Sequence, residues 1–213
     1  QPLDFLPLTE AEETALLGRA DFVIAIQERE AEAFRRMLPG KRVITVPMPL
    51  RPRPLATTAE TPGRALFVGG YSGHNIAAVQ WLNEEIWPRV RRAVPEAELV
   101  VAGTVGRAVV APAPGVRVAG PVGNLENEYA AAGVCLVPLP LGTGLKIKLV
   151  EAMGYGRAVV TTPAGAEGFA ELEAGRVAVV AADAATFADQ VARLLLSAPE
   201  RAAVVQRQLA WLG

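Results

Sequence analysis

The sequence has 213 residues, 51% of them hydrophobic and 20% charged, which is enough for one large core or for one domain with part of another. The formal net charge of −1, without a basic stripe, argues against a nucleic-acid partner. The lone Cys135 excludes a disulfide framework and suits a reducing compartment, and the lone His74 excludes a multi-histidine metal site. We therefore expect a cytoplasmic chain, with no metal and no cofactor.

Two helix–strand steps are predicted before residue 51. Thr9 is the expected N-cap of a helix over 9–18, with Glu12 as its capping-box partner. A strand over 21–26, a helix over 27–37 and a strand over 43–46 follow. Because the sequence begins at Gln1 and these steps are too few for a sheet of their own, we expect an excised or truncated segment.

A proline-rich stretch without periodicity covers residues 47–63. It predicts an extended linker, although a long surface loop within one domain would have the same composition. The expected organisation is therefore residues 1–50 as one part, 51–63 as a linker and 64–213 as the main domain.

From residue 64 onward, apolar runs alternate with helical patterns. The expected strands are 65–68, 98–102, 116–119, 134–139, 158–161 and 177–180, and the expected helices are 75–94, 125–132, 145–155, 184–196 and 199–212. Pro88 should kink or split the first of these helices. Continuous apolar strands alternating with helices predict a Rossmann-like α/β domain, an open parallel sheet with helices on both faces.

Ligands of such sheets bind beyond the carboxyl ends of the strands, so the loops there are the candidate site. The loop from Gly69 and Gly70 to His74 opens a helix, where a phosphate would bind well. His74 could donate to a phosphate or sugar oxygen, or it could simply be a solvated residue. Arg107, after the second strand, could reach a diphosphate or be a mobile surface arginine. Glu167, after the fifth strand, could contact a sugar hydroxyl.

The most informative stretch runs from Gly142 to Thr162 and predicts a glycine loop, a helix, a glycine turn and a buried strand. Lys148 and Glu151 lie three apart on the helix, so both can face one ligand. A cation for phosphate and a carboxylate for a ribose diol indicate a nucleotide-sugar site. An ordinary surface Lys–Glu pair would give the same pattern.

Together these residues resemble the C-terminal, donor-binding domain of a GT-B glycosyltransferase of the GT4-like retaining group. The resemblance runs from about residue 64 to the end, and residues 9–50 resemble the last steps of that family's N-terminal domain. It is carried by an ordered set of motifs: Leu66-Phe-Val-Gly-Gly70, His74-Asn75, Leu99-Val-Val-Ala-Gly103, Val137-Pro138, and Gly142-x-Gly-x-x-x-Lys-x-x-Glu-Ala-Met-x-x-Gly156.

The resemblance implies metal-independent transfer of a sugar from a nucleoside diphosphate donor to a glycan or lipid-linked acceptor, with retained anomeric configuration and at most peripheral membrane association. It also implies that Glu151 binds the ribose, Lys148 the diphosphate, and Gly69 and Gly70 the phosphate and sugar. The family's paired-glutamate motif has another Glu eight residues before the ribose Glu, where this sequence has Thr143. Sugar contact would then come from Thr143 or from backbone N–H groups of the loop, such as that of Gly144.

Three hypotheses about the function remain open. A fragment with only part of the N-terminal domain should bind the donor without turning it over alone. A nucleotide-sugar epimerase of GT-B fold would need acid–base residues, for which His74 and Glu167 are the candidates. A non-catalytic binding or scaffold module is favoured by Thr143 and by the short N-terminal part.

Overall fold

The computed structural model describes residues 8–46, 52–56, 59–140 and 147–213. The chain divides into two compact units, Gln1–Pro49 and Leu50–Gly213. Among the described residues, no helix is both long and apolar enough to cross a membrane.

The first unit alternates two helices with two parallel strands. Its elements are α1 (Glu10–Leu17), β1 (Phe22–Ala25), α2 (Glu28–Met37) and β2 (Arg42–Thr45). The capping box predicted for α1 is present, since the Thr9 Oγ1 accepts from the Glu12 amide and the Thr9 amide donates to the Glu12 carboxylate. All four predicted elements of this unit are confirmed to within a residue or two.

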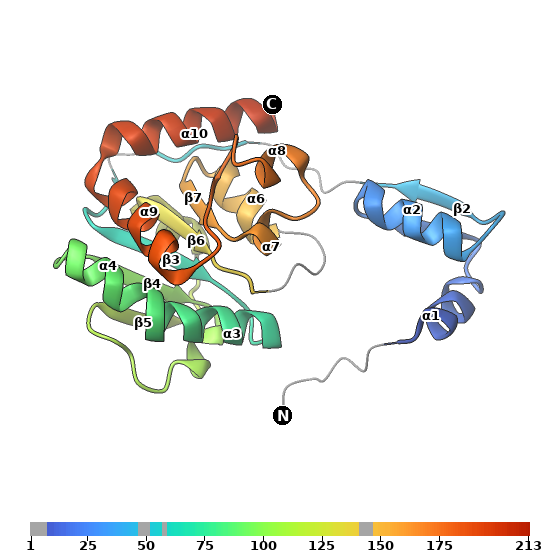
Figure 1. Cartoon of the computed structure of the whole chain (residues 1–213), viewed down its shortest axis with the longest axis horizontal. Helices are drawn as coiled ribbons and strands as arrows, with labels where there is room; N and C mark the ends of the chain where they lie inside the picture. Colours follow the sequence, from blue (N-terminus) through green and yellow to red (C-terminus); the bar gives the residue numbers. More distant parts are fainter. Residues whose placement is uncertain (1–7, 47–51, 57–58, 141–146) are drawn as a thin grey trace. The chain divides into compact units, whose positions relative to one another are not determined.

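The second unit is a six-stranded parallel sheet in the order β5-β4-β3-β6-β7-β8, which confirms the predicted fold class (Figure 1). Its strands are β3 (Arg64–Val68), β4 (Glu98–Ala102), β5 (Val116–Gly120), β6 (Val134–Val137), β7 (Ala158–Thr161) and β8 (Val179–Val180). Every residue of β6 and β7 is buried, which explains their continuous apolar sequence. The last strand is shorter than the predicted 177–180.

Helices cover both faces of this sheet (Figure 1). One face carries α3 (Gly73–Trp81), a π-helical turn (Leu82–Ile86), α4 (Trp87–Ala93) and α9 (Ala184–Leu196). The other face carries α5 (Leu125–Ala131), α6 (Ile147–Gly154) and α10 (Ala198–Leu212). Three short helices join strands: a 3₁₀ turn (Thr104–Ala108), α7 (Pro163–Ala166) and α8 (Ala170–Glu173). The sequence did not predict these three.

Pro88 splits the long predicted helix, as expected. The π-helical turn Leu82–Ile86 directly precedes α4, in which Pro88 occupies the first turn. A proline in a continuous α-helix lacks the amide for its hydrogen bond and clashes with the carbonyl four residues earlier. Widening the helix by one π turn relieves both problems.

The described part of the predicted linker is bonded to the second unit. Backbone amides of Arg53 and Leu55 donate to carbonyls at the end of α6, at 2.8 and 3.0 Å. Arg157, fully buried at the start of β7, donates to the Leu55 carbonyl at 2.7 Å and pairs with Glu60 at 2.8 Å. Residues 52–56 have no helix or strand and are fastened along the second unit.

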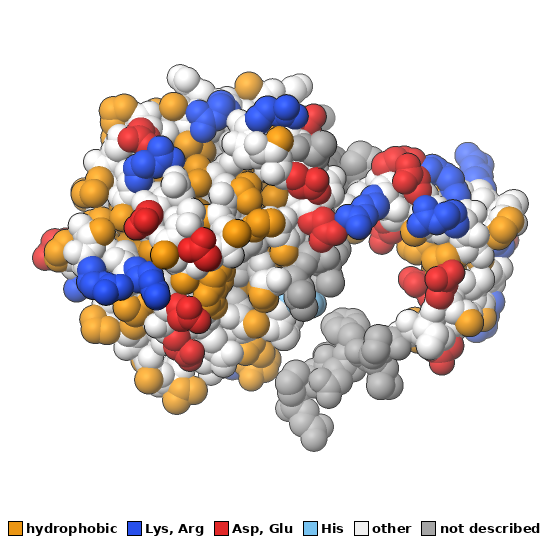
Figure 2. Space-filling view, viewed as in Figure 1, with side chains coloured by type: hydrophobic (Ala, Val, Ile, Leu, Met, Phe, Trp, Pro, Cys, Tyr) orange, Lys and Arg blue, Asp and Glu red, His pale blue; other side chains and the backbone are white. Residues whose placement is uncertain are grey.

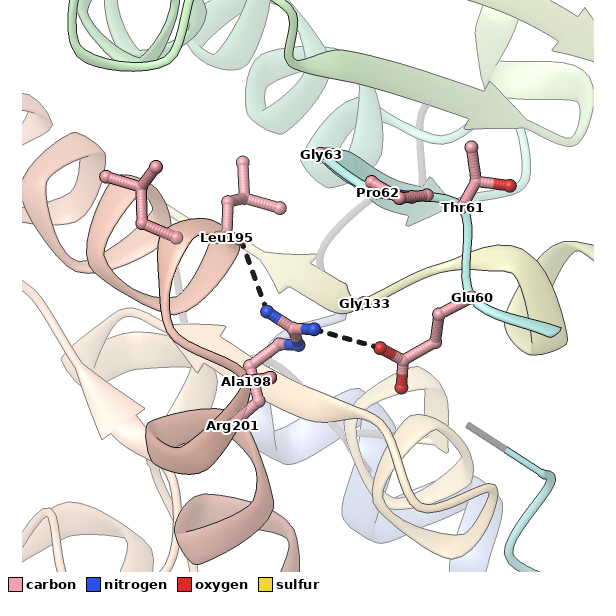
Figure 3. Close-up of a pocket in the computed structure, with 9 residues that line it drawn as sticks. Glu60, Thr61, Pro62, Gly63, Gly133, Leu195, Ala198 and Arg201 are labelled. Carbon is pink, nitrogen blue, oxygen red and sulfur yellow. Dashed lines mark hydrogen bonds and ion pairs between the residues drawn. The ribbon is translucent and has the colours of Figure 1, made fainter. Parts of the chain in front are cut away.

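A pocket of about 290 Å³ lies at the edge where the strands begin (Figure 3). Its polar groups satisfy one another, because Arg201 pairs with Glu60 at 3.1 Å and donates to the Leu194 carbonyl at 2.8 Å. The pocket therefore belongs to the structure that fastens residues 52–56 and 59–63. On the face that Figure 2 shows, acidic and basic side chains of the larger unit are interspersed.

Candidate functional site

The strand order places the topological switch point between β3 and β6. The chain runs outward from β3 to β4 and β5, then returns to place β6 on the other side of β3. The carboxyl ends of β3 and β6 therefore lie side by side, at the usual ligand position in such sheets. The segments after these two strands are among the candidate loops that the sequence indicated.

The loop after β3 is held close to its neighbours by glycine. The Gly69 amide donates to the Ala102 carbonyl at 3.0 Å, and the Gly69 carbonyl accepts from the Val105 amide at 3.1 Å. A Cβ on Gly69 would lie 3.2 Å from both Asn75 and Val105 side chains, and one on Gly103 would lie 2.2 Å from the Gly69 carbonyl oxygen. Gly103 also has φ +97°, so this turn requires glycine, while Gly69 leaves little room for a side chain.

Lys148 lies in the first turn of α6, largely buried at the centre of this edge. Its amine donates to Asn75 Oδ1 and lies 5.4 Å from the centroid of the Phe67 ring. Burial lowers the pKa of Lys148 to about 8, so the amine still carries its charge at neutral pH. A partly desolvated cation at this edge is suited to an anionic ligand.

Asn75 joins Lys148 to the glycine loop. While its Oδ1 accepts from Lys148, its Nδ2 donates to the Gly70 carbonyl at 2.9 Å. The sequence placed Asn75 only at a helix start and gave it no role. The one signal that could have identified it is its position in the first turn after the glycines, facing the carboxyl edge.

Glu151 lies one helical turn beyond Lys148, half-buried, and accepts a hydrogen bond of 3.0 Å from the Tyr129 hydroxyl. Tyr129 comes from α5 and is only 1% exposed. Burial raises the pKa of Tyr129 far above its usual range, so the hydroxyl stays protonated and donates. Sequence reasoning missed Tyr129 because it lies on a different helix, 22 residues away.

Leu149, Ala152 and Met153 are buried and form the packed side of α6. The opposite side carries Lys148, Glu151 and the partly exposed residue Tyr155, whose ring centroid lies 4.8 Å from that of Tyr129. The Lys148 amine thus meets the Phe67 ring at the end of β3, and the Glu151 carboxylate meets Tyr129 of α5. These two groups are held by different partners, Asn75 of α3 and Tyr129 of α5.

The other candidate residues lie around this centre. Gly69 is buried and Gly70 exposed, and His74 is exposed in the first turn of α3. Arg107 is exposed in the 3₁₀ turn rather than in an open loop. Glu167 follows α7 and is partly exposed. Thr143 and Gly144 lie outside the described residues.

Threonines tie the loop after β7 to the end of β6. The Thr162 Oγ1 donates to the Leu139 carbonyl at 2.6 Å and accepts from the Gly165 amide at 3.0 Å, which caps α7. The Thr161 Oγ1 donates to the Val137 carbonyl at 2.9 Å. The segment that carries Glu167 is therefore anchored at the same edge as Lys148.

Comparison with known proteins identifies a family. The family model described as glycosyl transferases group 1 matches residues 62–197, which is more than half of the chain. No curated protein matches the chain by sequence.

Solved structures with the same architecture are distant in sequence. A TarM variant of S. aureus, in complex with fondaparinux, alpha-GlcNAc-glycerol and UDP, has a TM-score of 0.74 at 10% identity, covering 99% of this chain and 44% of its own. Anabaena HepE, in complex with UDP and glucose, has a TM-score of 0.64 at 16% identity, covering 96% and 63%. The pneumococcal O-GlcNAc transferase GtfA, in complex with UDP and GlcNAc, has a TM-score of 0.70 at 13% identity, covering 94% and 43%. At these identities the likeness shows the GT-B fold, and the chain spans less than two thirds of each of these proteins.

Proposed function

The chain belongs to the group 1 glycosyl transferases, and we propose that it is the donor-binding part of a retaining, GT4-like glycosyltransferase. In this proposal, a sugar is transferred from a nucleoside diphosphate donor to a glycan or lipid-linked acceptor. The transfer needs no metal ion, because side-chain and backbone donors neutralise the diphosphate. The protein works in the cytoplasm, at most peripherally attached to a membrane.

The observation that carries this proposal is that Lys148 and Glu151 lie together on α6 at the switch point of the sheet. The two side chains lie one helical turn apart on α6, each held by a side chain from another element. A buried ammonium group suits a diphosphate, and a carboxylate accepts hydrogen bonds from two vicinal hydroxyls. A nucleoside diphosphate carries both groups a few bonds apart.

The remaining candidate residues complete the proposed donor site. Backbone groups of Gly69 and Gly70, which precede α3, approach the phosphate and sugar, as expected at a helix N-terminus. Thr143 and Gly144 would contact the sugar from the loop before α6. His74, Arg107 and Glu167 are proposed to lie nearer the ends of the donor. HepE and GtfA were both determined with UDP, which makes UDP the first nucleotide to test.

We propose the same domain division as the sequence predicted, with residues 1–50 as the end of an N-terminal domain, 51–63 as the connection and 64–213 as the donor domain. The contacts of Arg53 and Leu55 with the end of α6 support a connection that is fastened to the donor domain. Since acceptors of two-domain enzymes are held by the other domain, transfer by residues 1–213 alone is not expected.

Thr143 favours a second candidate, a non-catalytic nucleotide-sugar module. One experiment separates it from a transferase and from an epimerase. The full-length protein is incubated with UDP-glucose or UDP-GlcNAc and a panel of glycan and lipid-linked acceptors, and the anomeric signals are followed by NMR. An α-linked product from the α-linked donor supports retaining transfer, and a β-linked product contradicts it. A changed sugar still attached to UDP identifies an epimerase, and an unchanged donor identifies a binding module.

A further inference from the structure

We propose that Tyr129 is a positioning residue for the donor site: its hydroxyl holds the Glu151 carboxylate in the orientation that receives the ribose hydroxyls. The proposal rests on the proposed function, because it assigns Glu151 to the ribose of a nucleoside diphosphate. Tyr129 itself would touch no part of the donor.

The position of the Tyr129 hydroxyl is fixed by the core of the domain. The side chain is 1% exposed, and its ring packs on that of Tyr155 with a centroid distance of 4.8 Å and an interplanar angle of 33°. The helix that carries it is capped at Asn124, whose Oδ1 accepts from the Glu126 amide at 2.9 Å. The hydroxyl is therefore a rigid donor, whereas Glu151 is half-buried and would otherwise rotate.

The hydrogen bond from Tyr129 gives the two oxygens of the Glu151 carboxylate different roles. Tyr129 donates to Glu151 Oε2 at 3.0 Å. A carboxylate carries about four lone-pair positions, so Oε1 and the second lone pair of Oε2 remain for a ligand. This bond restricts the rotation of the carboxylate. Two ribose hydroxyls then meet a preorganised acceptor, and binding does not have to immobilise the side chain.

Tyr129 also connects the carboxylate to the cation. Tyr129 and Lys148 both line a small cavity between α6 and the strands β3 and β6. Tyr129 thus bonds to Glu151 through its hydroxyl and shares the lining of this cavity with Lys148. This places the ribose acceptor and the diphosphate cation in one packed unit, with a fixed spacing between them.

The test compares each nucleotide with its counterpart that lacks the ribose diol. UDP, GDP and ADP and their 2′,3′-dideoxy forms are titrated calorimetrically into the native chain and into Tyr129→Phe, Tyr155→Phe and Glu151→Gln. Tyr155→Phe is the matched control, since it removes a hydroxyl from the stacked neighbour but leaves the bond to Glu151. The readout is the ratio of the dissociation constants of the ribonucleotide and its dideoxy form within one variant. A general loss of stability affects both constants alike and cancels in this ratio.

We expect Tyr129→Phe to weaken binding of the preferred ribonucleotide about tenfold, as for a lost hydrogen bond to a charged group, and to leave the dideoxy form within about twofold. Tyr155→Phe should keep the native ratio, and Tyr129→Phe should add little in a Glu151→Gln background. An unchanged ratio in Tyr129→Phe, beside a native chain that prefers the ribose form, overturns the positioning role and leaves the proposed function standing. A native chain that binds nucleotides without preferring the ribose form also overturns it, because Glu151 then does not read the diol. Binding of no nucleotide contradicts the proposed function itself.

Discussion

Replacing Lys148 with methionine should stabilise the fold while weakening the site. The lysine amine is held in a largely buried position, and burial is the main cause of its lowered pKa. Methionine has a similar length and no charge, so it fills the same space beside Phe67 without the cost of desolvation. A residue whose removal stabilises the protein is retained for a reason other than stability.

The size of the effect follows from the pKa. Lowering the pKa from 10.5 to about 8 means that the charged amine is disfavoured in the folded chain by about 3 kcal/mol. Asn75 Oδ1 loses its lysine donor in the variant, which costs about 1 kcal/mol. The free energy of unfolding at pH 7 should therefore rise by about 2 kcal/mol.

The sign of the pH dependence gives an independent check. Because the folded pKa lies below the unfolded one, unfolding takes up a proton between about pH 8 and pH 10.5. The contribution of Lys148 to stability is therefore unfavourable below pH 8 and disappears as the pH rises toward 10.5. The stability difference between native chain and Lys148→Met should shrink over this range.

The assay is urea unfolding of both chains from pH 7 to pH 10.5, together with UDP titration at pH 7. Lys148→Arg is the control, for which the free energy of unfolding should change in the opposite direction. A guanidinium cannot lose its charge, so this variant should be less stable than the native chain. UDP affinity should fall about tenfold or more in Lys148→Met. A Lys148→Met variant that is less stable than the native chain at pH 7, or a difference that does not change with pH, would refute this reasoning.

Two further substitutions test the supports of the site. Gly103→Ala should lower the free energy of unfolding by at least about 2 kcal/mol, because its Cβ would lie 2.2 Å from the Gly69 carbonyl oxygen, and it should weaken UDP binding in the same titration. Arg157→Met should lower the free energy of unfolding in urea by about 3 kcal/mol, since Glu60 would lose its fully buried partner. The control is the exposed Arg193, where Arg193→Met should change the free energy of unfolding by less than about 0.5 kcal/mol. Equal losses for both arginines would contradict the argument.

Most of the sheet could be predicted because its strands are buried on both faces. The run from Ala158 to Val160 is apolar, and the predicted strand 158–161 agrees with the bounds of β7. The break at Pro88 followed from the geometry of proline alone. These features depend on local sequence and on the single fact that the sheet is covered.

The partners of the site residues could not be predicted in the same way. Asn75 meets Lys148 across 73 residues, and this contact exists only because β6 lies beside β3. Tyr129 lies in the predicted helix 125–132, and no local motif marks it as a site residue. The sequence indicates which groups are chemically suitable, but the strand order decides which of them meet.

Arg157 shows the same limit of sequence-based prediction for a residue of the core. An arginine before a strand is usually exposed, yet this one has no exposed surface. Its burial depends on Glu60 and on the Leu55 carbonyl, which belong to the stretch that was predicted as a linker. A charged residue can be buried only where distant partners satisfy it, and composition does not reveal them.

The most direct test of the account is a calorimetric titration of this chain with UDP, GDP, ADP and dTDP, beside the Glu151→Ala variant. The account predicts saturable binding of at least one of these nucleotides, weakened about tenfold or more by the substitution. Binding that is equally strong in Glu151→Ala would contradict the assignment of the ribose site. No binding of any of the four would contradict the central claim that this chain carries a nucleotide-sugar donor site.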